Sequence, residues 1–336
     1  MAKVSILGGG SWGIALAVLL HKNGHEITVW SAVEAEITML KETHEHKMLP
    51  GVVLPADMGF TTADKEAVAD KDLLIMAVAS SYTRGTAHRL SSLVAPGQKI
   101  VNVAKGIEEN TLMTLSEIIE EEIPQADVAV LSGPSHAEEV SRGLPTTIVV
   151  GAKKKETAEY LQNLFMNDVF RVYTSSDVLG MELGGSLKNV VALAAGIADG
   201  LGYGDNTKAA LITRGITEIA RLGTAMGARF ETFCGLTGIG DLIVTCASMH
   251  SRNRRAGILM GQGKTMEEAM AEVKMVVEGV YSARAAMGLA EKYKIQLPII
   301  EQVNLVLFEG KTADEAVKDL MLRDKKIEIS DAQWEE

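Results

Sequence analysis

The sequence predicts an α/β protein of two domains: a parallel β-sheet flanked by helices in residues 1–176, and a mostly α-helical domain in residues 177–336. Three observations predict this class. Short apolar runs alternate with amphipathic stretches in the first half, as in a doubly wound sheet. Strand signals fade after about Ser175, where long helical stretches take over. The chain of 336 residues is also long enough to bury a hydrophobic core in each domain.

Short apolar runs predict the strands of the first domain. They are Lys3–Leu7, Glu26–Trp30, Leu73–Val78, Lys99–Val103, Val128–Leu131 and Thr146–Val150. Amphipathic stretches between them predict helices at Trp12–Lys22, Tyr82–Leu93 and Leu112–Glu122. Several of the strands are apolar throughout, which is typical of a parallel sheet that helices cover on both faces.

Stretches rich in Ala, Leu and Gly predict the helices of the second domain. They are Asp177–Gly200, Thr207–Gly227, Asn253–Met260, Thr265–Glu272 and Ser282–Tyr293. We place the domain boundary near Ser175–Val178 and expect the highly charged end, Lys325–Glu336, to form a loose tail.

Composition and charge exclude several classes of protein. The formal net charge of -11 argues against a nucleic-acid partner, because such binding relies on Lys and Arg. The cysteines, Cys234 and Cys246, are too few for a disulfide framework and fit a reducing cytoplasm. We find no signal peptide, and the apolar run Val190–Ala198 is about half as long as a membrane span. We therefore expect a cytoplasmic protein without an integral membrane segment.

A glycine-rich pattern follows the first predicted strand. Residues 8–13, Gly-Gly-Gly-Ser-Trp-Gly, match G-x-G-x-x-G and open a predicted helix. In this context Gly8 allows a tight turn, Gly10 lets the backbone approach a pyrophosphate, and Gly13 lets the helix pack close to the sheet. The free N–H groups of the helix start add an anion site. The pattern predicts dinucleotide binding; a glycine-rich turn without a ligand is the alternative.

Two further segments follow predicted strands. Lys105 lies beyond the end of one strand, at the edge of the sheet where ligands of α/β proteins bind, and a solvated surface lysine is an equally open interpretation. In the segment Gly-Pro-Ser-His at 133–136, Gly133 helps to form a turn and we expect Ser135 to cap a short helix. We expect no catalytic role for His136.

The helix that opens the second domain contains Gly184, Gly185 and Lys188. Each glycine costs about 1 kcal/mol of helix stability relative to Ala, which indicates that another segment approaches the helix closely. Lys188 lies one turn beyond Gly184 among apolar neighbours. Partial burial and a nearby cation such as Lys105 would lower its pKa toward that of a general acid/base. A lysine that snorkels at a domain seam is the alternative.

A second glycine-rich turn, at 235–240, precedes Asp241, whose carboxylate can orient a lysine ammonium or accept a hydrogen bond from a substrate hydroxyl. Ser251 is a predicted N-cap for a helix that begins near Arg252. A helix start and a guanidinium form an anion site, although the arginines at 252, 254 and 255 can also be a solvated face. We interpret Cys246 as a small core residue. Glu278, in a loop before a helix, can contact the nicotinamide or ribose end of a cofactor.

Together these segments resemble the NAD(P)-dependent glycerol-3-phosphate dehydrogenases of bacterial type. The likeness runs in order from Gly8 to about Val280. Beyond the first glycine-rich turn, it rests on Gly-Pro-Ser-His-Ala at 133–137, Leu-Lys-Asn at 187–189, Gly-Asp-Leu at 240–242 with Thr-Cys at 245–246, Ser-Arg-Asn at 251–253 and Val-Glu-Gly at 277–279. The resemblance implies a Rossmann-type N-terminal domain and an α-helical C-terminal domain, with substrate and nicotinamide in the cleft between them.

The resemblance also implies a role for each matching residue. We expect no metal site. It makes Lys188 the catalytic proton donor and acceptor. With the first glycine-rich turn, the implied cofactor contacts are Gly8, Gly10, Ser11, Trp12, Gly13, Lys105, Ala137, Arg252, Val276 and Glu278. The implied substrate contacts are Lys105, Gly133, Ser135, Lys188, Asp241, Ser251, Arg252 and Asn253.

The implied reaction reduces dihydroxyacetone phosphate to sn-glycerol 3-phosphate, the backbone of glycerophospholipids, with NAD(H) or NADP(H) as cofactor. Relatives often carry a basic residue just after the second strand, where this chain has Ala32 and Val33. Glu34 and Glu36 come slightly later, where acids favour the first turn of a helix. We therefore expect both cofactors to be accepted. A homodimer is the assembly that we consider for this chain.

Two other functions compete with this interpretation. A 3-hydroxyacid or 6-phosphogluconate type dehydrogenase also combines a Rossmann-type domain, a helical domain and a helix lysine, but the Ser-Arg-Asn segment after Gly-Asp-Leu argues against it. A non-catalytic NAD-binding regulator would bind the cofactor without turnover.

Overall fold

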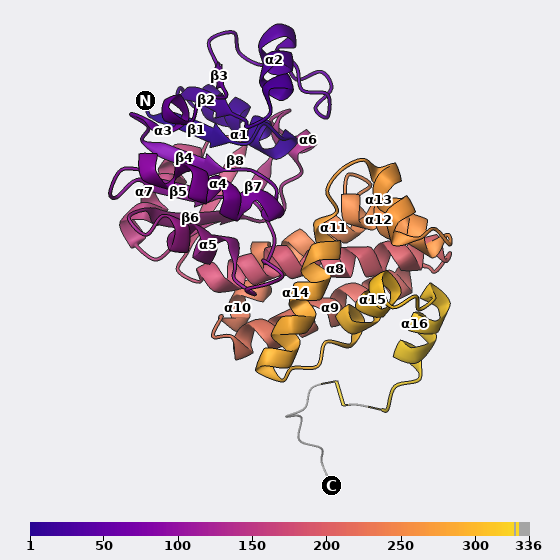
Figure 1. Cartoon of the computed structure of the whole chain (residues 1–336). Coiled ribbons are helices and arrows are strands. Elements are labelled where there is room, and N and C mark those ends of the chain that lie inside the picture. Colours follow the sequence, from indigo (N-terminus) through magenta and orange to yellow (C-terminus); the bar gives the residue numbers. More distant parts are fainter. Residues whose placement is uncertain (326, 329–336) are drawn as a thin grey trace.

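The computed structural model describes residues 1–325, 327 and 328, which form a sheet domain followed by a helical domain (Figure 1). The sheet has eight strands in the order β3-β2-β1-β4-β5-β6-β7-β8. The strands are β1 (Lys3–Leu7), β2 (Glu26–Trp30), β3 (Gly59–Thr61), β4 (Leu73–Met76), β5 (Lys99–Asn102), β6 (Asp127–Ser132), β7 (Thr146–Ala152) and β8 (Phe170–Ser175). This confirms the predicted α/β class.

The direction of the strands differs from the prediction at one side of the sheet. Neighbouring strands are parallel from β3 to β6, but β7 runs antiparallel to β6 and parallel to β8. The sequence analysis also missed β3 and β8. Strand β3 has only three residues, and β8 is an edge strand that alternates buried and exposed side chains, so neither has the continuous apolar run of a central strand.

Successive strand residues point to opposite faces of the sheet. Since the central strands are largely apolar, both faces carry apolar side chains, and helices cover both. Ile6 and Ile75 belong to the core under one face, whereas Leu7 and Leu74 belong to the core under the other. The helices of this domain are α1 (Ser11–Lys22), α2 (Glu34–Thr43), α3 (Asp64–Val68), α4 (Thr83–Leu90), α5 (Leu115–Glu122), α6 (Ala137–Val140) and α7 (Lys155–Phe165), with short 3₁₀ turns η1 (Ser80–Tyr82) and η2 (Ser91–Leu93).

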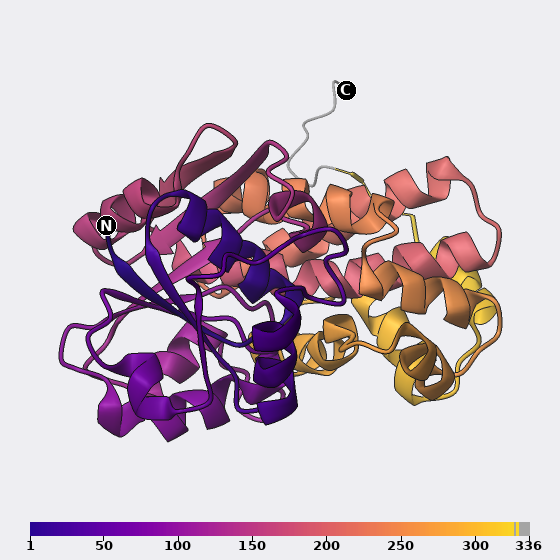
Figure 2. The same ribbon diagram turned by 90° about the horizontal axis from the view of Figure 1, so that it is seen from above.

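The helical domain is built around α8 (Val178–Gly200), which Asp177 caps by accepting a hydrogen bond from the Gly180 N–H at 3.0 Å. Figure 2 shows the two domains side by side, with the sheet domain in indigo to magenta. The other segments of the helical domain are α9 (Asp205–Ala225), α10 (Phe230–Phe233), η3 (Leu236–Gly240), α11 (Asp241–Ala247), α12 (Arg252–Gly261), α13 (Met266–Val273), α14 (Glu278–Tyr293), α15 (Pro298–Phe308) and α16 (Ala313–Met321).

Glycines bring α12 against α8 at backbone distance. A Cβ atom on Gly196 would lie 2.1 Å from the Arg254 carbonyl oxygen, and one on Gly261 would lie 2.3 Å from the Ile197 carbonyl oxygen. This contact fixes the position of α12 along α8. Both helices carry predicted site residues.

Two helical segments of the described chain are long and apolar enough to cross a membrane by length and composition: Val178–Gly200 and Phe230–Ala247. The first is the core helix α8, and 83% of its most apolar window is buried inside the protein. The second combines α10, η3 and α11, and 39% of its window is buried. Within the helical domain, α8 thus has the burial of a core helix.

Candidate active site

The glycine-rich turn has the geometry that its pattern predicts. Gly8 has φ +127°, and a Cβ there would lie 2.8 Å from the backbone of Ala77. A Cβ on Gly13 would lie 2.4 Å from the Gly8 carbonyl oxygen, whereas Gly10 has open space within 4 Å. Gly10 is the N-cap of α1 and makes no side-chain cap bond. The first N–H groups of α1 therefore remain available to a phosphate, so this turn fits a dinucleotide.

Asp241 lies between two lysines from different domains. Its Oδ1 accepts a hydrogen bond from Lys188 Nζ at 2.6 Å, and its Oδ2 accepts one from Lys105 Nζ at 2.5 Å. Lys105 Nζ also donates to the Gly133 carbonyl at 3.0 Å, and Lys188 Nζ to Thr245 Oγ1 at 2.6 Å. Lys105 is thus part of the site, and its interpretation as a solvated surface lysine is wrong.

Burial and charge set the protonation of this cluster. Burial lowers the pKa of Lys188 to about 8; the Asp241 carboxylate opposes this shift and the charge of Lys105 adds to it. Burial alone would raise the pKa of Asp241, but the two lysines outweigh it and lower that pKa. The cluster therefore pairs an ionised carboxylate with a lysine that can change its protonation near neutral pH.

The glycines of α8 let the neighbouring segments approach the cluster, as the sequence predicts. A Cβ on Gly184 would lie 2.6 Å from the Thr237 carbonyl oxygen in η3. A Cβ on Gly185 would lie 2.9 Å from Ser132 Oγ, at the end of β6, and 3.5 Å from Lys105 Cγ. These glycines bring η3 and the sheet edge against the helix that carries Lys188.

The start of α12 carries the next group of predicted site residues. Ser251 Oγ accepts from the Arg254 N–H at 3.2 Å, which confirms the predicted N-cap. Asn253 donates to Asn189 Oδ1 on α8 and accepts from the Gly279 N–H on α14, each at 2.9 Å. Asn253 therefore fixes α12 between two other helices.

The three arginines of this helix start have different environments. Arg252 is half-buried and has no carboxylate oxygen within 4.0 Å in the described part of the chain. Arg254 pairs with Asp199 at 2.8 Å, and Arg255 donates to the Val273 carbonyl at 3.5 Å. The interpretation of all three as a solvated face is therefore wrong, and Arg252 has the guanidinium that can receive an anion.

Glu278 connects the two domains. It is the first residue of α14 rather than a loop residue, and its Oε1 accepts from the Ser80 N–H, beyond β4, at 3.2 Å. The Ser80 hydroxyl donates to the other carboxylate oxygen. Burial raises the pKa of Glu278, while the bonds from Ser80 oppose that shift.

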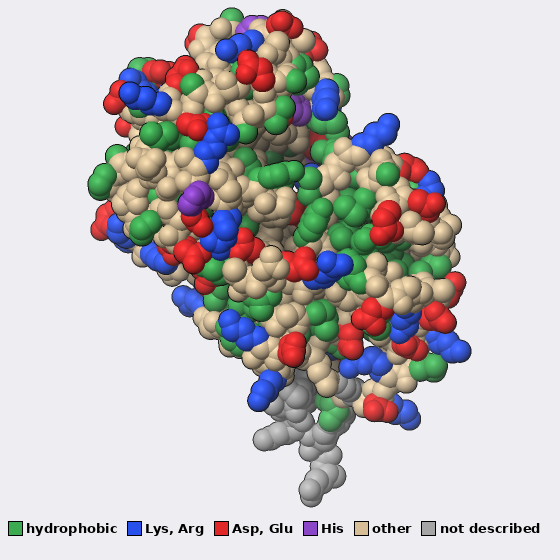
Figure 3. Space-filling view, in the orientation of Figure 1, with side chains coloured by type: hydrophobic (Ala, Val, Ile, Leu, Met, Phe, Trp, Pro, Cys, Tyr) green, Lys and Arg blue, Asp and Glu red, His purple; other side chains and the backbone are tan. Residues whose placement is uncertain are grey.

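A cavity of about 350 Å³ joins these elements. The space-filling view shows the surface hollowed between the two domains (Figure 3). The predicted site residues that line the cavity are Gly10, Ser11, Trp12, Lys105, Ser135, Ala137, Lys188, Ser251, Arg252, Asn253 and Glu278. The other predicted residues support it from behind: Gly8 and Gly13 shape the turn, and Gly133 and Asp241 hold the lysines. Val276 does not line the cavity, whereas its neighbour Met275 does.

The segment at 133–136 differs in detail from the prediction. His136, not Ser135, is the N-cap of α6, and it makes no side-chain cap bond. Ser135 Oγ instead donates to the Gly133 carbonyl at 2.9 Å. The imidazole of His136 lies 5.6 Å from that of His250, centroid to centroid, and burial lowers its pKa.

Sequence reasoning missed three polar contributors. Thr245 contacts Lys188, Asn189 contacts Asn253, and Ser80 contacts Glu278. Asn189 and Thr245 stood in quoted motifs, directly after Lys188 and one turn after Asp241, so helical spacing could have placed them. No local signal marks Ser80, because its partner is 198 residues away.

The fold and the cavity define a class of protein: a two-domain NAD(P)-dependent dehydrogenase with a buried lysine in the same cavity as the dinucleotide turn. Family models described as NAD-dependent glycerol-3-phosphate dehydrogenase N-terminus and C-terminus match residues 3–158 and 177–318. A protein of Agathobacter rectalis named glycerol-3-phosphate dehydrogenase [NAD(P)+] is 66% identical over 99% of this chain and 100% of its own. One of Bacillus subtilis with the same name is 51% identical over 98% of this chain and 97% of its own.

Solved structures agree with the sequence relatives. The crystal structure of a glycerol-3-phosphate dehydrogenase from Coxiella burnetii matches with a TM-score of 0.93 and 34% identity, over 96% of this chain and 99% of that one. The chain belongs to the NAD-dependent glycerol-3-phosphate dehydrogenase family.

Proposed function

We propose that this chain reduces dihydroxyacetone phosphate to sn-glycerol 3-phosphate with NAD(P)H, and that Lys188 is its acid/base. The observation that carries the proposal is the Lys188–Asp241–Lys105 cluster, whose lysines line the same cavity as the dinucleotide turn. The names of the relatives support the substrate, and the product connects the chain to glycerophospholipid synthesis.

The proton that ketone reduction requires comes from a side chain of the protein. When bound, the reduced nicotinamide supplies a hydride to the carbonyl carbon of the substrate. Negative charge then develops on the carbonyl oxygen, and protonated Lys188 donates its proton there. In the reverse direction neutral Lys188 takes the hydroxyl proton. Asp241 orients the Lys188 ammonium through its 2.6 Å bond, and Lys105 holds the other carboxylate oxygen. A lysine with a pKa of about 8 suits both directions near neutral pH.

The phosphate of the substrate fits the start of α12. Arg252 offers a half-buried guanidinium there, and its planar fork matches a phosphate. We assign three other predicted substrate contacts, Ser135, Ser251 and Asn253, to the same cavity, since all three line it.

The domain division, assembly and location follow as further parts of the proposal. We assign cofactor binding to residues 1–176 and catalysis to residues 177–336, since β8 ends at Ser175 and α8 begins at Val178; residues 326 and 329–336 lie outside the described part. Both cysteines are free, which supports a reducing cytoplasm. The proposed assembly is a homodimer, and sedimentation of the purified chain tests it.

Following NADH and NADPH oxidation with dihydroxyacetone phosphate tests the proposed reaction. We expect turnover with the phosphorylated ketone and little with dihydroxyacetone. Activity on 3-hydroxyacids or 6-phosphogluconate in place of the phosphorylated ketone would refute it, as would cofactor binding without any turnover.

A further inference from the structure

The carboxylate of Glu36 lies at the end of β2, although Glu36 itself belongs to the first turn of α2. Ser31, the residue directly after β2, donates a hydrogen bond from its hydroxyl group to Glu36 Oε2 at 2.5 Å. The Ser31 oxygen also accepts from the Val33 N–H at 3.1 Å, so the turn between β2 and α2 is held closed. This turn returns the acid to the strand end, where the linear sequence has no acid.

The same carboxylate touches the glycine-rich turn. A Cβ on Gly9 would lie 2.9 Å from both Cδ and Oε2 of Glu36. Gly9 stands between Gly8, which forms the tight turn, and Gly10, which has open space within 4 Å. In dinucleotide folds an acid at the end of the second strand binds the ribose 2′-OH, next to this turn.

The charged groups around this carboxylate favour a cofactor with a 2′-hydroxyl on its adenine ribose over one with a 2′-phosphate. Burial lowers the pKa of His46 from 6.5, although the charge of Glu36 opposes this shift, so burial favours the neutral imidazole. Arg89 is held by Asp64 at 2.7 Å and lies over the Trp30 ring. Lys47, beside His46, is exposed and has no ion pair with Glu36 in the described residues.

We propose that Glu36 reads the 2′ position of the adenine ribose, so that the chain selects NAD(H) over NADP(H). The carboxylate accepts a hydrogen bond from the 2′-OH of NAD(H), and it repels the 2′-phosphate of NADP(H) at short range. The inference rests on the proposed function only for the cofactor site, and it narrows the expectation that both cofactors are accepted to a preference for NAD(H).

The test is direct binding of NADH and NADPH by calorimetry, in the absence of ketone substrate. We expect the intact chain to bind NADH at least about 10-fold more tightly, as a charge-assisted hydrogen bond predicts. Glu36→Gln should narrow the ratio of the two Kd values by about 10-fold or more, mainly through tighter NADPH binding. Glu36→Arg should reverse the preference, because a guanidinium receives the 2′-phosphate.

Glu34→Gln is the matched control, since Glu34 is an exposed acid in the same helical turn. Equal Kd values for the two cofactors in the intact chain, or equal shifts in Glu34→Gln and Glu36→Gln, would overturn the proposal. So would a large loss of NADPH affinity in Lys47→Gln, because a cation would then read this position. A chain that binds NADH selectively but does not reduce dihydroxyacetone phosphate would contradict the proposed reaction and leave the role of Glu36 supported.

Discussion

The protonation of a single side chain, Lys188, determines the expected pH dependence of both reaction directions. Ketone reduction needs the protonated amine, so kcat/KM for dihydroxyacetone phosphate should fall as pH rises through about 8, the pKa to which burial lowers this lysine. Oxidation of glycerol 3-phosphate needs the neutral amine and should rise through the same range. Asp241→Asn removes the charge that holds the proton, so both profiles should move to lower pH. The measurement is kcat/KM against pH in each direction; profiles that do not move in the variant would exclude Asp241 from tuning the lysine.

Removal of the Lys188 amine should separate chemistry from cofactor binding. Lys188→Ala is expected to lower kcat by ~10²–10⁴, the usual contribution of a positioned acid/base. The Kd for NADH should change little, because the glycine-rich turn lies on the other domain. Lys155→Ala, at an exposed lysine whose side chain is 83% accessible, is the control and should keep parental activity. Near-parental kcat in Lys188→Ala would refute the mechanism.

Arg252 should act on substrate affinity. Arg252→Ala removes a guanidinium for which the described chain offers no carboxylate within 4.0 Å, so no buried partner is left unpaired. Loss of its contact with phosphate should raise KM for dihydroxyacetone phosphate by about 10–100-fold. Arg171→Ala, an exposed arginine on β8, is the comparison. An unchanged KM would move the phosphate site elsewhere in the cavity.

Most residues of the candidate site are recognisable in the sequence because their signals are local. Gly8, Gly10 and Gly13 form one short pattern, and the glycines before Lys188 and Asp241 mark close approaches. The contacts that the sequence hides depend on how the backbone folds: Ser80 meets Glu278, 198 residues away, and the turn after β2 brings Glu36 back to Ser31. A pattern along the chain carries no information on such distances.

At the level of elements, prediction succeeded where a segment is almost continuously apolar and buried. The strands β1, β2, β4 and β5 and the helix α8 lie close to their predicted ranges. Short or half-exposed elements were missed, among them β3, β8, α3 and α15. The antiparallel direction of β7 has no local signature, because only its pairing with β6 defines it.

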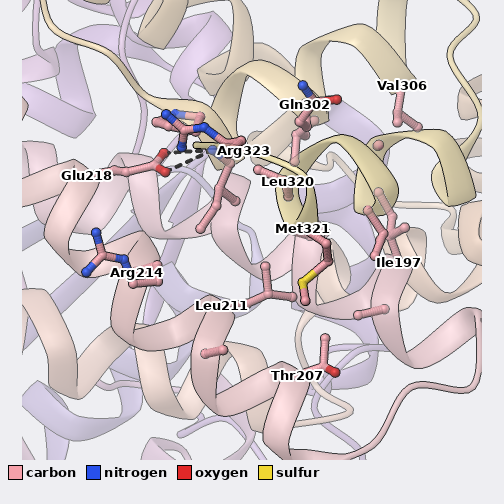
Figure 4. Close-up of a pocket in the computed structure, with 18 of the residues that line it drawn as sticks. Ile197, Thr207, Leu211, Arg214, Glu218, Gln302, Val306, Leu320, Met321 and Arg323 are labelled. Carbon is pink, nitrogen blue, oxygen red and sulfur yellow. Dashed lines mark hydrogen bonds between the residues drawn. The ribbon is translucent and has the colours of Figure 1, made fainter. Parts of the chain in front are cut away.

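The start of α15 depends on one buried acid, which gives a prediction for stability. Glu218 lies at the charged end of a cavity of about 470 Å³ between α8, α9, α15 and α16, opposite Ile197 and Val306 (Figure 4). Its carboxylate accepts from the Ile299 N–H at 2.9 Å and from the Ile300 N–H at 3.3 Å. Burial raises its pKa from 4.5 to about 7.

A raised acid pKa means that the folded chain holds this proton more tightly than the unfolded chain. The contribution of Glu218 to stability is therefore greatest below pH 4.5 and is lost as pH rises to about 7. Glu218→Gln keeps an acceptor for the helix start but cannot ionise. The free energy of unfolding of the variant should fall by about 3 kcal/mol less than that of the parent across this pH range. Denaturant unfolding at several pH values measures it, with Glu309→Gln, at an exposed acid, as control. Parallel curves for the parent and Glu218→Gln would contradict the assignment.

On the scale of the whole molecule, the site exists only where the two domains meet. Lys105 and Ser80 come from the sheet domain, and their partners Asp241 and Glu278 come from the helical domain. Ligands that fill the cavity should therefore stabilise both domains together, although each domain has its own core. These interdomain bonds couple the halves through the buried carboxylates of Asp241 and Glu278, and the loss of a partner is costly when it leaves a buried charge unpaired.

This coupling predicts how heat unfolds the liganded chain. NADH with glycerol 3-phosphate is a useful pair, because both are in the reduced state and no hydride can pass between them. Each ligand at about 100 times its Kd should add ~2.7 kcal/mol to the free energy of unfolding. Calorimetry should show one transition that NADH moves upward and glycerol 3-phosphate moves further, whereas glycerol without phosphate adds nothing. In Asp241→Asn the bond from Lys105 loses its negatively charged acceptor, so the further upward shift caused by glycerol 3-phosphate should be smaller. Two separate transitions, with NADH moving only one of them, would show that the domains unfold independently and that the buried bonds across the cavity do not couple them.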